Sequence, residues 1–244
     1  AERAARNALD AAMWDLDSQL SSVPVWVQLG RPPRATLRSA ITLSIDTPAR
    51  MGEAAARIAD AGLIKIKVDA DDPAARIEAV RQAAPRAHLI VDPNESWTLD
   101  ILGELMPTLE RVGVNLIEQP LPAIADTELL GFASRIPICA DESCHTSADL
   151  PRLLERYQAI NIKLDKTGGL TEALALADAA RAAGMKVMVG CMVASSLSMA
   201  PGIVLAQQAD VVHLDGPLLL EQDQEPALRY DGATLFPDER VWST

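Results

Sequence analysis

The chain has 244 residues, of which 22 are Lys or Arg and 34 are Asp or Glu, so its formal net charge is −12. This acidic balance argues against nucleic acid or an anionic membrane as a partner, because binding either would require a basic face. Hydrophobic residues make up 49% of the sequence, which is enough for a large buried core. The length suits one domain of the α/β type.

No apolar run approaches the ~20 residues needed to cross a membrane, and the N-terminal residues show no secretory signal pattern. The three cysteines, Cys139, Cys144 and Cys191, have no paired spacing, and an odd number is more typical of a reducing compartment than of a disulfide framework. Cys144 stands beside His145, but no second Cys/His pair completes a zinc site. We therefore expect a cytoplasmic protein with structural thiols.

The first 20 residues predict an amphipathic helix. Its apolar face consists of Ala5, Leu9, Ala12, Met13, Leu16 and Leu20. Gly and Pro in residues 30–33 then interrupt the pattern. At the other end of the chain, the polar residues 221–244 are expected to pack across one end of the fold.

Eight short apolar runs alternate with helical segments along the rest of the chain. The runs are residues 39–45, 63–68, 88–91, 115–117, 136–140, 159–164, 186–189 and 211–214. Thr47-Pro48 and Asp72-Pro73 mark helix starts, because the first helical turn tolerates proline. Nearly continuous apolar strands that alternate with helices predict a parallel sheet covered on both faces, and eight repeats match a (β/α)8 barrel. The alternative, an open doubly wound sheet, lacks a Gly-rich phosphate loop after its first strand.

A charged residue ends five consecutive strands of this prediction. These residues are Lys67, Asp92, Glu118, Asp141 and Lys163, which follow one another at intervals of 25, 26, 23 and 22 residues. In a barrel the carboxyl ends of the strands meet at one mouth, where active sites of this fold lie. Three neighbouring carboxylates would repel one another without a cation, and such oxygen ligands suit Mg²⁺ or Mn²⁺. Strands two and six of eight are opposed, so a substrate on the metal would have an ammonium group on each face.

These motifs carry a resemblance to a known family. The segments Lys-Ile-Lys (65–67), Asp-Pro-Asn (92–94), Ile-Glu-Gln-Pro (117–120), Ala-Asp-Glu-Ser (140–143) and Asn-Ile-Lys-Leu (161–164) resemble the muconate-lactonizing-type branch of the enolase superfamily. Within that branch, residues 160–169, 189–192 and 214–218 look like the dipeptide epimerases that interconvert L-Ala-L-Glu and L-Ala-D-Glu. The resemblance covers essentially the whole chain.

The resemblance implies a metal-assisted proton transfer at a carbon next to a carboxylate. Asp92, Glu118 and Asp141 would be the ligands of Mg²⁺, with Mn²⁺ as a substitute, and the metal would stabilise the enediolate formed when the α-proton leaves. Lys67 and Lys163 would be the acid/base pair, one on each face, so that removal on one side and return on the other invert the centre.

Lys65 is expected to support Lys67 and to lie near the substrate carboxylate. A free lysine has a pKa of about 10.4 and is protonated at pH 7. A neighbouring cation and partial burial lower that value, and Lys65, two residues from Lys67 on the same strand face, would supply the cation.

Strand eight departs from the family pattern. Dipeptide epimerases usually show Asp-x-Asp there, whereas this chain has His213-Leu214-Asp215. Asp215 would receive the α-ammonium group of a dipeptide. His213 points to the same side and would replace the second carboxylate by a group that is neutral or cationic near pH 7.

The family also carries an α+β capping domain before the barrel, and this sequence opens in the helix that usually follows it. We expect residues 1–36 to be a helix and linker leading from that absent domain, residues 37–220 to be the catalytic barrel, and residues 221–244 to be a tail packed on the barrel. A separate capping segment and a second copy of the chain both remain open as partners.

The expected function is Mg²⁺-dependent epimerisation of L-Ala-D/L-Glu-type dipeptides, in the setting of cell-wall peptide breakdown. Three other lysine–lysine enzymes remain as alternatives: an N-acylamino-acid racemase, an o-succinylbenzoate synthase and a cycloisomerase. An inactive, truncated barrel is a further alternative of a different class.

Overall fold

The computed structural model of the chain describes residues 2–31 and 34–242. The chain divides into two compact units, each of which has its own internal contacts. One, which we call the carboxylate unit, consists of residues 40–144 and 149–160. The other, the terminal unit, consists of residues 1–39, 145–148 and 161–244.

The carboxylate unit is built from parallel strands that alternate with helices. Its strands are β2 (Ile41–Leu43), β3 (Leu63–Lys67), β4 (His88–Asp92), β5 (Val114–Glu118), β6 (Ile138–Ala140) and the first residues of β7 (Ala159–Ile162). Its helices are α3 (Pro48–Arg57), α4 (Pro73–Ala83), α5 (Leu99–Arg111) and α6 (Leu150–Leu153), with the 3-10 turns η1 (Ala59–Ala61) and η2 (Asp126–Leu129). A further turn, η3 (Ser147–Asp149), lies where the chain passes between the units.

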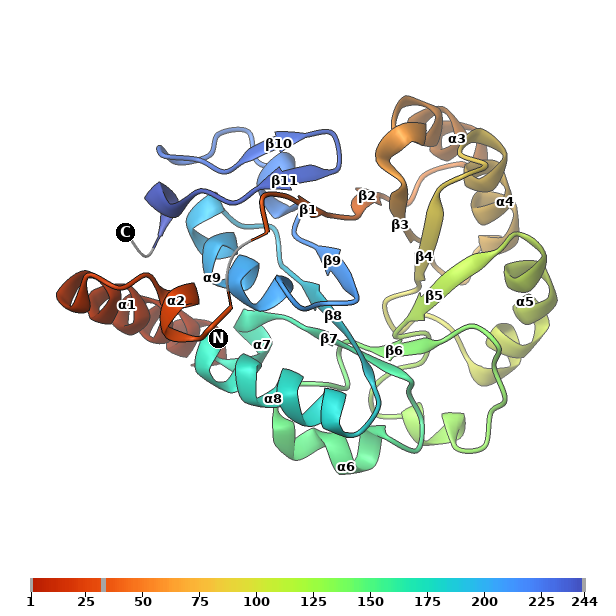
Figure 1. Cartoon of the computed structure of the whole chain (residues 1–244). Helices are drawn as coiled ribbons and strands as arrows, with labels where there is room; N and C mark the ends of the chain where they lie inside the picture. The colour runs from red at the N-terminus through yellow and green to blue at the C-terminus, as the bar shows by residue number, and fades with distance from the viewer. Residues whose placement is uncertain (1, 32–33, 243–244) are drawn as a thin grey trace. The chain divides into compact units, whose positions relative to one another are not determined.

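The two predicted proline-marked helix starts are confirmed. The Thr47 side chain accepts a hydrogen bond from the Arg50 backbone N–H at the start of α3, and the Asp72 side chain accepts one from the Ala75 N–H at the start of α4. These caps satisfy donors that a first turn leaves open. Figure 1 shows α3 and α4 side by side, next to β3 and β4.

The terminal unit combines the second half of the α/β pattern with both ends of the chain. It contains α1 (Glu2–Ser21), α2 (Val25–Gln28), α7 (Leu164–Thr167), α8 (Leu170–Ala182), β8 (Lys186–Gly190), α9 (Ser196–Ala206), β9 (Val211–His213) and the turns η4 (Gly216–Leu219) and η5 (Glu239–Val241). A three-stranded antiparallel sheet has the order β1 (Leu37–Arg38), β11 (Thr234–Phe236), β10 (Arg229–Asp231).

All eight predicted parallel strands are present, five of them shorter than predicted and β4, β5 and β8 longer by one or two residues. They form one sheet in which strands β2 to β9 follow one another in chain order. The most strongly trimmed is the first, predicted at residues 39–45 and observed at Ile41–Leu43. The interior positions of these strands, such as Ile64, Ile66 and Leu89, are fully buried and form the core.

Helix α1 is confirmed as a helix, but its predicted apolar face lies in solvent. Leu9, Met13 and Leu20 are 68%, 71% and 78% exposed. The buried side instead carries Asn7 and Ser18, and Figure 1 shows α1 beside α7 and α8. The Asn7 side-chain amide donates to Asp165 Oδ1 at 2.9 Å, so polar contacts hold this helix on its neighbours.

The C-terminal segment contains a β-hairpin that the sequence analysis missed. β10 and β11 turn at Gly232, whose φ of 53° lies in the left-handed region that glycine tolerates. The Ser39 N–H donates to the Ala233 carbonyl at 2.8 Å, and the Tyr230 hydroxyl donates to the Leu214 carbonyl at 2.6 Å. The tail is thereby fixed to β1 and to the end of β9.

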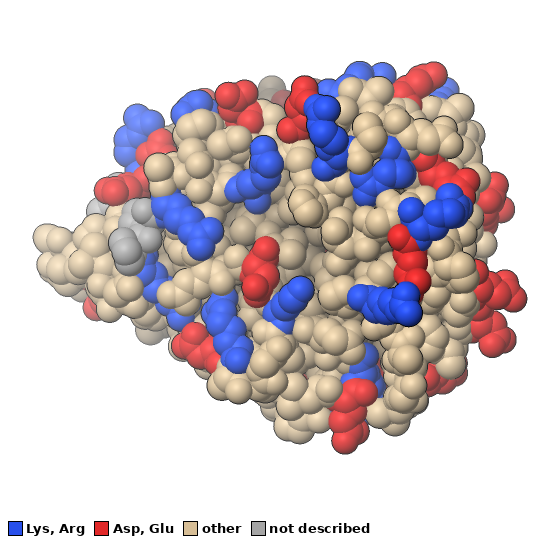
Figure 2. All heavy atoms as spheres, turned by 45° about the vertical axis from the view of Figure 1, so that its right-hand side comes forward, with Lys and Arg blue, Asp and Glu red and all other residues tan. Residues whose placement is uncertain are grey.

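The described helices include none long and apolar enough to cross a membrane. Figure 2 shows acidic and basic side chains interspersed over the face that it draws, without a continuous field of one sign.

Candidate active site

The centre of the carboxylate unit is a buried cluster of opposite charges. Lys65 Nζ lies 2.8 Å from Asp92 Oδ2 and 2.8 Å from both carboxylate oxygens of Glu118. All three side chains are at most 1% exposed. The parallel register places the residues on neighbouring strands, with their side chains on the same side of the sheet.

The charges of this cluster stabilise one another. Burial by itself lowers the pKa of Lys65, but the attraction of Glu118, Asp92 and Asp141 outweighs it and raises that pKa. Burial likewise raises the pKa of Asp92, and the ammonium groups of Lys65 and Lys67 more than offset it, so this pKa is lowered. Lys65 is therefore a permanent cation at neutral pH.

Lys67 occupies a more accessible position than Lys65. Its Nζ lies 2.6 Å from Asp92 Oδ2, but its side chain is 27% exposed. It also donates to the Asn94 side-chain oxygen. Asn94 has a left-handed φ of 45°, and its N–H donates to Asp92 Oδ1 at 3.0 Å. Of the two lysines on β3, Lys67 is thus the one that a substrate can reach.

Asn94 and Glu142 are site residues that the sequence reasoning did not single out. The Asn94 amide donates to Glu142 Oε1 at 3.2 Å. Burial, followed by the nearby charges of Asp141 and Asp92, raises the pKa of Glu142. The signals were present in the Asp-Pro-Asn and Ala-Asp-Glu-Ser motifs, where these residues adjoin the predicted metal ligands.

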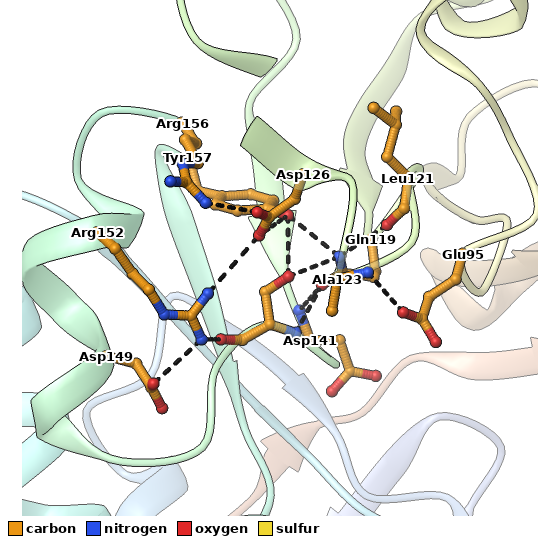
Figure 3. A network of polar contacts seen from close by, with 11 residues as sticks. Glu95, Gln119, Leu121, Ala123, Asp126, Asp141, Asp149, Arg152, Arg156 and Tyr157 are labelled. Atoms are coloured by element: carbon orange, nitrogen blue, oxygen red, sulfur yellow. Dashed lines mark hydrogen bonds and ion pairs between the residues drawn. The ribbon is translucent and has the colours of Figure 1, made fainter. Parts of the chain in front are cut away.

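Gln119 is a third residue that was missed, and Figure 3 shows it at the centre of a polar network. It follows Glu118 on a left-handed turn with φ of 34° and is fully buried. Its Oε1 accepts from the backbone N–H groups of Asp141 and Ser143, at 2.8 and 3.1 Å. Its Nε2 donates to the Leu121 carbonyl and the Ser143 hydroxyl, both at 2.9 Å. One amide therefore joins the ends of β5 and β6, which carry two of the predicted metal ligands.

An outer layer of charges supports this amide. The Tyr157 hydroxyl lies 3.1 Å from Gln119 Nε2 and donates to Asp126 Oδ2 at 3.1 Å. Burial raises the pKa of Tyr157, so the phenol stays neutral. Arg156 and Arg152 pair with Asp126, as Figure 3 shows. The carboxyl ends of β5 and β6 are thus held by a connected set of buried polar groups.

In the terminal unit, Lys163 follows β7 directly and occupies the N-cap position of α7. Lys163 is buried, with only 7% of its surface exposed. On β8, a Cβ at Gly190 would lie 2.6 Å from Asn161 Oδ1, so a side chain there would displace that amide. The Lys166 ammonium donates to the Asn161 carbonyl at 3.0 Å. Asn161, two residues before Lys163, is therefore contacted from both β8 and α7.

The two residues predicted at the end of strand eight contact each other. His213 Nε2 lies 2.9 Å from Asp215 Oδ1, and the residues are 5% and 3% exposed. The following Gly216 leaves no room for a side chain, because a Cβ there would lie 2.6 Å from the Met192 carbonyl. The turn after β9 is consequently fixed by close backbone packing.

The predicted metal ligands fit a hard cation by their chemistry. Asp92, Glu118 and Asp141 are oxygen donors, at most 1% exposed, and buried carboxylates require compensating positive charge. Lys65 supplies part of it. Within the described residues, no three His, Cys, Asp or Glu side chains are already close enough together to hold a metal ion. The donor set therefore fits Mg²⁺ in type, and the ligand assignment remains a prediction.

Eight parallel strands in chain order, with lysines and carboxylates at their carboxyl ends, define a (β/α)8-type enzyme scaffold. Residues 50–239 match the family described as enolase C-terminal domain-like. The chain belongs to this family, within the enolase superfamily, and the predicted fold class is confirmed.

Similar proteins are racemases and epimerases. The N-acetyl-D-glutamate racemase of a Pseudoalteromonas species is 50% identical over 234 residues, which are 96% of this chain and 74% of that protein. The L-Ala-D/L-Glu epimerase of Escherichia coli is 46% identical over 229 residues, which are 93% of this chain and 71% of that protein. A dipeptide epimerase from Enterococcus faecalis, solved in complex with Mg and L-Leu-L-Tyr, matches with a TM-score of 0.91 and 28% identity, over 98% of this chain and 71% of that chain. The predicted enzyme class, an isomerase, is confirmed at the level of the family.

Proposed function

We propose that the chain carries out Mg²⁺-dependent racemisation or epimerisation at the α-carbon of an N-substituted amino acid. L-Ala-D/L-Glu-type dipeptides are one substrate class and N-acylamino acids are the other, as the names of the relatives suggest. The observation that carries the proposal is the contact of the accessible Lys67 with Asp92, beside the buried Lys65. To remove a proton from the carbon next to a substrate carboxylate, the enzyme needs a lysine that the substrate can reach. Lys67 fits this requirement, with the cation Lys65 and the buried Asp92 beside it.

In this proposal Asp92, Glu118 and Asp141 would hold Mg²⁺. The bound metal supplies a Lewis acid that stabilises negative charge on the substrate carboxylate. A relative solved with Mg supports a divalent metal in this family. Gln119 would keep the ends of β5 and β6 in register for this purpose, since it bonds to the backbone of both.

Lys67 and Lys163 would perform the proton transfer. One takes the α-proton on its Nζ and the other returns a proton to the opposite face, which inverts the centre. Lys65 keeps its own proton, because its carboxylate neighbours raise its pKa. Lys67 is the more accessible of the two, with a side chain 27% exposed against 1% for Lys65. The roles of Lys65 and Lys67 therefore differ although both are on β3.

The test is exchange of the substrate α-proton for deuterium in D₂O, followed by NMR, with and without Mg²⁺. K67A and K163A should each abolish inversion, while one of them retains exchange on a single stereoisomer. K186A is the matched control, because Lys186 is exposed at the amino end of β8. Normal inversion by both K67A and K163A would refute the two-base mechanism.

A further inference from the structure

The pair at the end of β9 bears on which substrate class fits. His213 Nε2 is 2.9 Å from Asp215 Oδ1, and both residues are buried. They lie at the carboxyl end of a parallel strand, the end at which ligands bind in α/β sheets. Leu214 lies between the two residues, and its carbonyl accepts a hydrogen bond from the Tyr230 hydroxyl at 2.6 Å. This bond helps to hold the backbone that carries His213 and Asp215.

A carboxylate binds a ligand ammonium most strongly when its oxygens have no other hydrogen-bond donor or cation beside them. Here an imidazole from the same strand already lies at hydrogen-bond distance from Asp215 Oδ1. An arriving ammonium would have to share or displace this contact and would lose its own hydration in a buried place. A neutral amide substituent meets neither penalty.

We propose that His213 makes this chain select N-acylated amino acids over dipeptides that carry a free α-ammonium group. The proposal rests on the proposed function and concerns the group attached to the substrate nitrogen. Asp215 already has a partner within the protein in His213, so a substrate with an uncharged acyl group does not have to displace that contact. His213 is therefore a specificity-determining residue and takes no part in proton transfer.

The experiment compares N-acetyl-L-glutamate and N-acetyl-D-glutamate with L-Ala-L-Glu on the full chain and on H213D and H213N. Deuterium exchange gives kcat and KM for each compound, and calorimetric titration gives the Kd. The native chain should prefer N-acetylglutamate by at least about tenfold in kcat/KM and in Kd. H213D should reduce this preference at least tenfold, mainly through a lower KM for L-Ala-L-Glu, because it restores a second carboxylate. H213N should fall between the two.

H88D is the charge-matched control, because His88 is exposed at the start of β4, and it should leave the preference unchanged. Circular dichroism checks that each variant is folded. The proposal is overturned if the native chain binds L-Ala-L-Glu as tightly as N-acetylglutamate, or if H213D and H213N both keep the native preference. The proposed function fails if no compound exchanges its α-proton. In that case the ratio of the Kd values for L-Ala-L-Glu and N-acetylglutamate still tests the role of His213.

Discussion

Lys65 is the residue on which the buried charges of the carboxylate unit depend. Its ammonium bridges Asp92 and Glu118 at 2.8 Å. K65M keeps the length of the side chain and removes the charge, which leaves two buried carboxylates facing each other. We expect a loss of about 3–5 kcal/mol in the free energy of unfolding, as for a buried ion pair that loses one partner. Urea denaturation measures it, and added Mg²⁺ should recover part of it.

The control for this change is K186M, on an exposed lysine of β8, which should stay within about 0.5 kcal/mol of the native chain. A K65M variant as stable as K186M would mean that the carboxylates do not depend on Lys65.

Gln119 offers a test of metal-site positioning that is separate from catalysis. In Q119E a carboxylate oxygen replaces the Nε2 that donates to the Leu121 carbonyl and the Ser143 hydroxyl. The end of β6 should then shift, and Asp141 with it. Mg²⁺ affinity should fall about 10–100-fold, the usual effect of losing a group that orients ligands. Calorimetric titration measures it.

Q208E is the isosteric control, because Gln208 is exposed in the turn after α9, and it should bind Mg²⁺ like the native chain. If Q119E binds Mg²⁺ with native affinity, Gln119 has no part in placing the ligands.

Among the elements, β8 carries Gly190, which lies against the Asn161 side chain of β7. A Cβ there would lie 2.6 Å from Asn161 Oδ1, so G190A requires the buried Asn161 side chain to move. We expect a loss of about 1–3 kcal/mol in stability, typical of overpacking in a core, and weaker exchange activity because Lys163 follows β7. Thermal and urea denaturation check the first effect.

Gly103 in α5 provides the opposite case, because nothing lies within 4 Å of a Cβ built on it. G103A should raise stability by about 0.5–1 kcal/mol, since alanine favours a helix over glycine. Equal effects of G190A and G103A would contradict the tight fit of Gly190 against the Asn161 side chain.

The start of α9 is held by Asp223, a residue of the C-terminal segment. Its Oδ1 accepts from the Ser196 N–H at 3.0 Å, and its Oδ2 accepts from the Ser196 hydroxyl. Burial alone would raise the pKa of Asp223, but the hydrogen bonds from Ser196 and Gln224 lower it. A lowered pKa means that the carboxylate adds stability above the pKa of the unfolded chain and loses it as the pH falls through the folded value.

D223N should therefore be less stable than the native chain at pH 7, and the difference should shrink as the pH falls below about 4. Urea denaturation at pH 7, 5 and 3.5 measures the difference. E221Q, on an exposed neighbour, should show no such trend. A difference between D223N and the native chain that stays constant across this pH range would exclude the charge of Asp223 as the cause.

The strand ends were predictable because two features of the local sequence coincide at each one. An apolar run fixes the strand and a charge ends it, so Asp92, Glu118 and Lys163 could be placed without knowledge of long-range contacts. Gln119 could not, because its role depends on a left-handed turn and on backbone groups more than 20 residues away. The β10–β11 hairpin had a local signal, Asp231-Gly232, which the polarity of the tail obscured.

At the scale of the whole molecule, the predicted apolar face of α1 adds little to the buried core of the described residues. Leu9, Met13, Leu16 and Leu20 are all at least 56% exposed. Replacing all four by glutamine removes little buried area, so each change should alter stability by no more than about 0.5 kcal/mol. The variant should also be more soluble, because it loses an exposed apolar patch.

Thermal denaturation and light scattering at rising concentration check both effects. The same substitution at Met51 and Val80, which are at most 1% exposed, should unfold the chain or cost several kcal/mol. A marked loss of stability in the α1 variant would show that the stripe has a structural role within this chain.

The order of the eight parallel strands has a consequence for synthesis on the ribosome. Each strand pairs with the one made just before it, so the sheet can grow as the chain emerges, through contacts of short sequence separation. The pairing of Leu37 with Leu235 is of the opposite kind, since it joins β1 to β11. That small sheet can form only when nearly all of the chain has been translated. We therefore expect pulse-labelled hydrogen exchange on nascent chains to protect β3 to β5 early and β1 last.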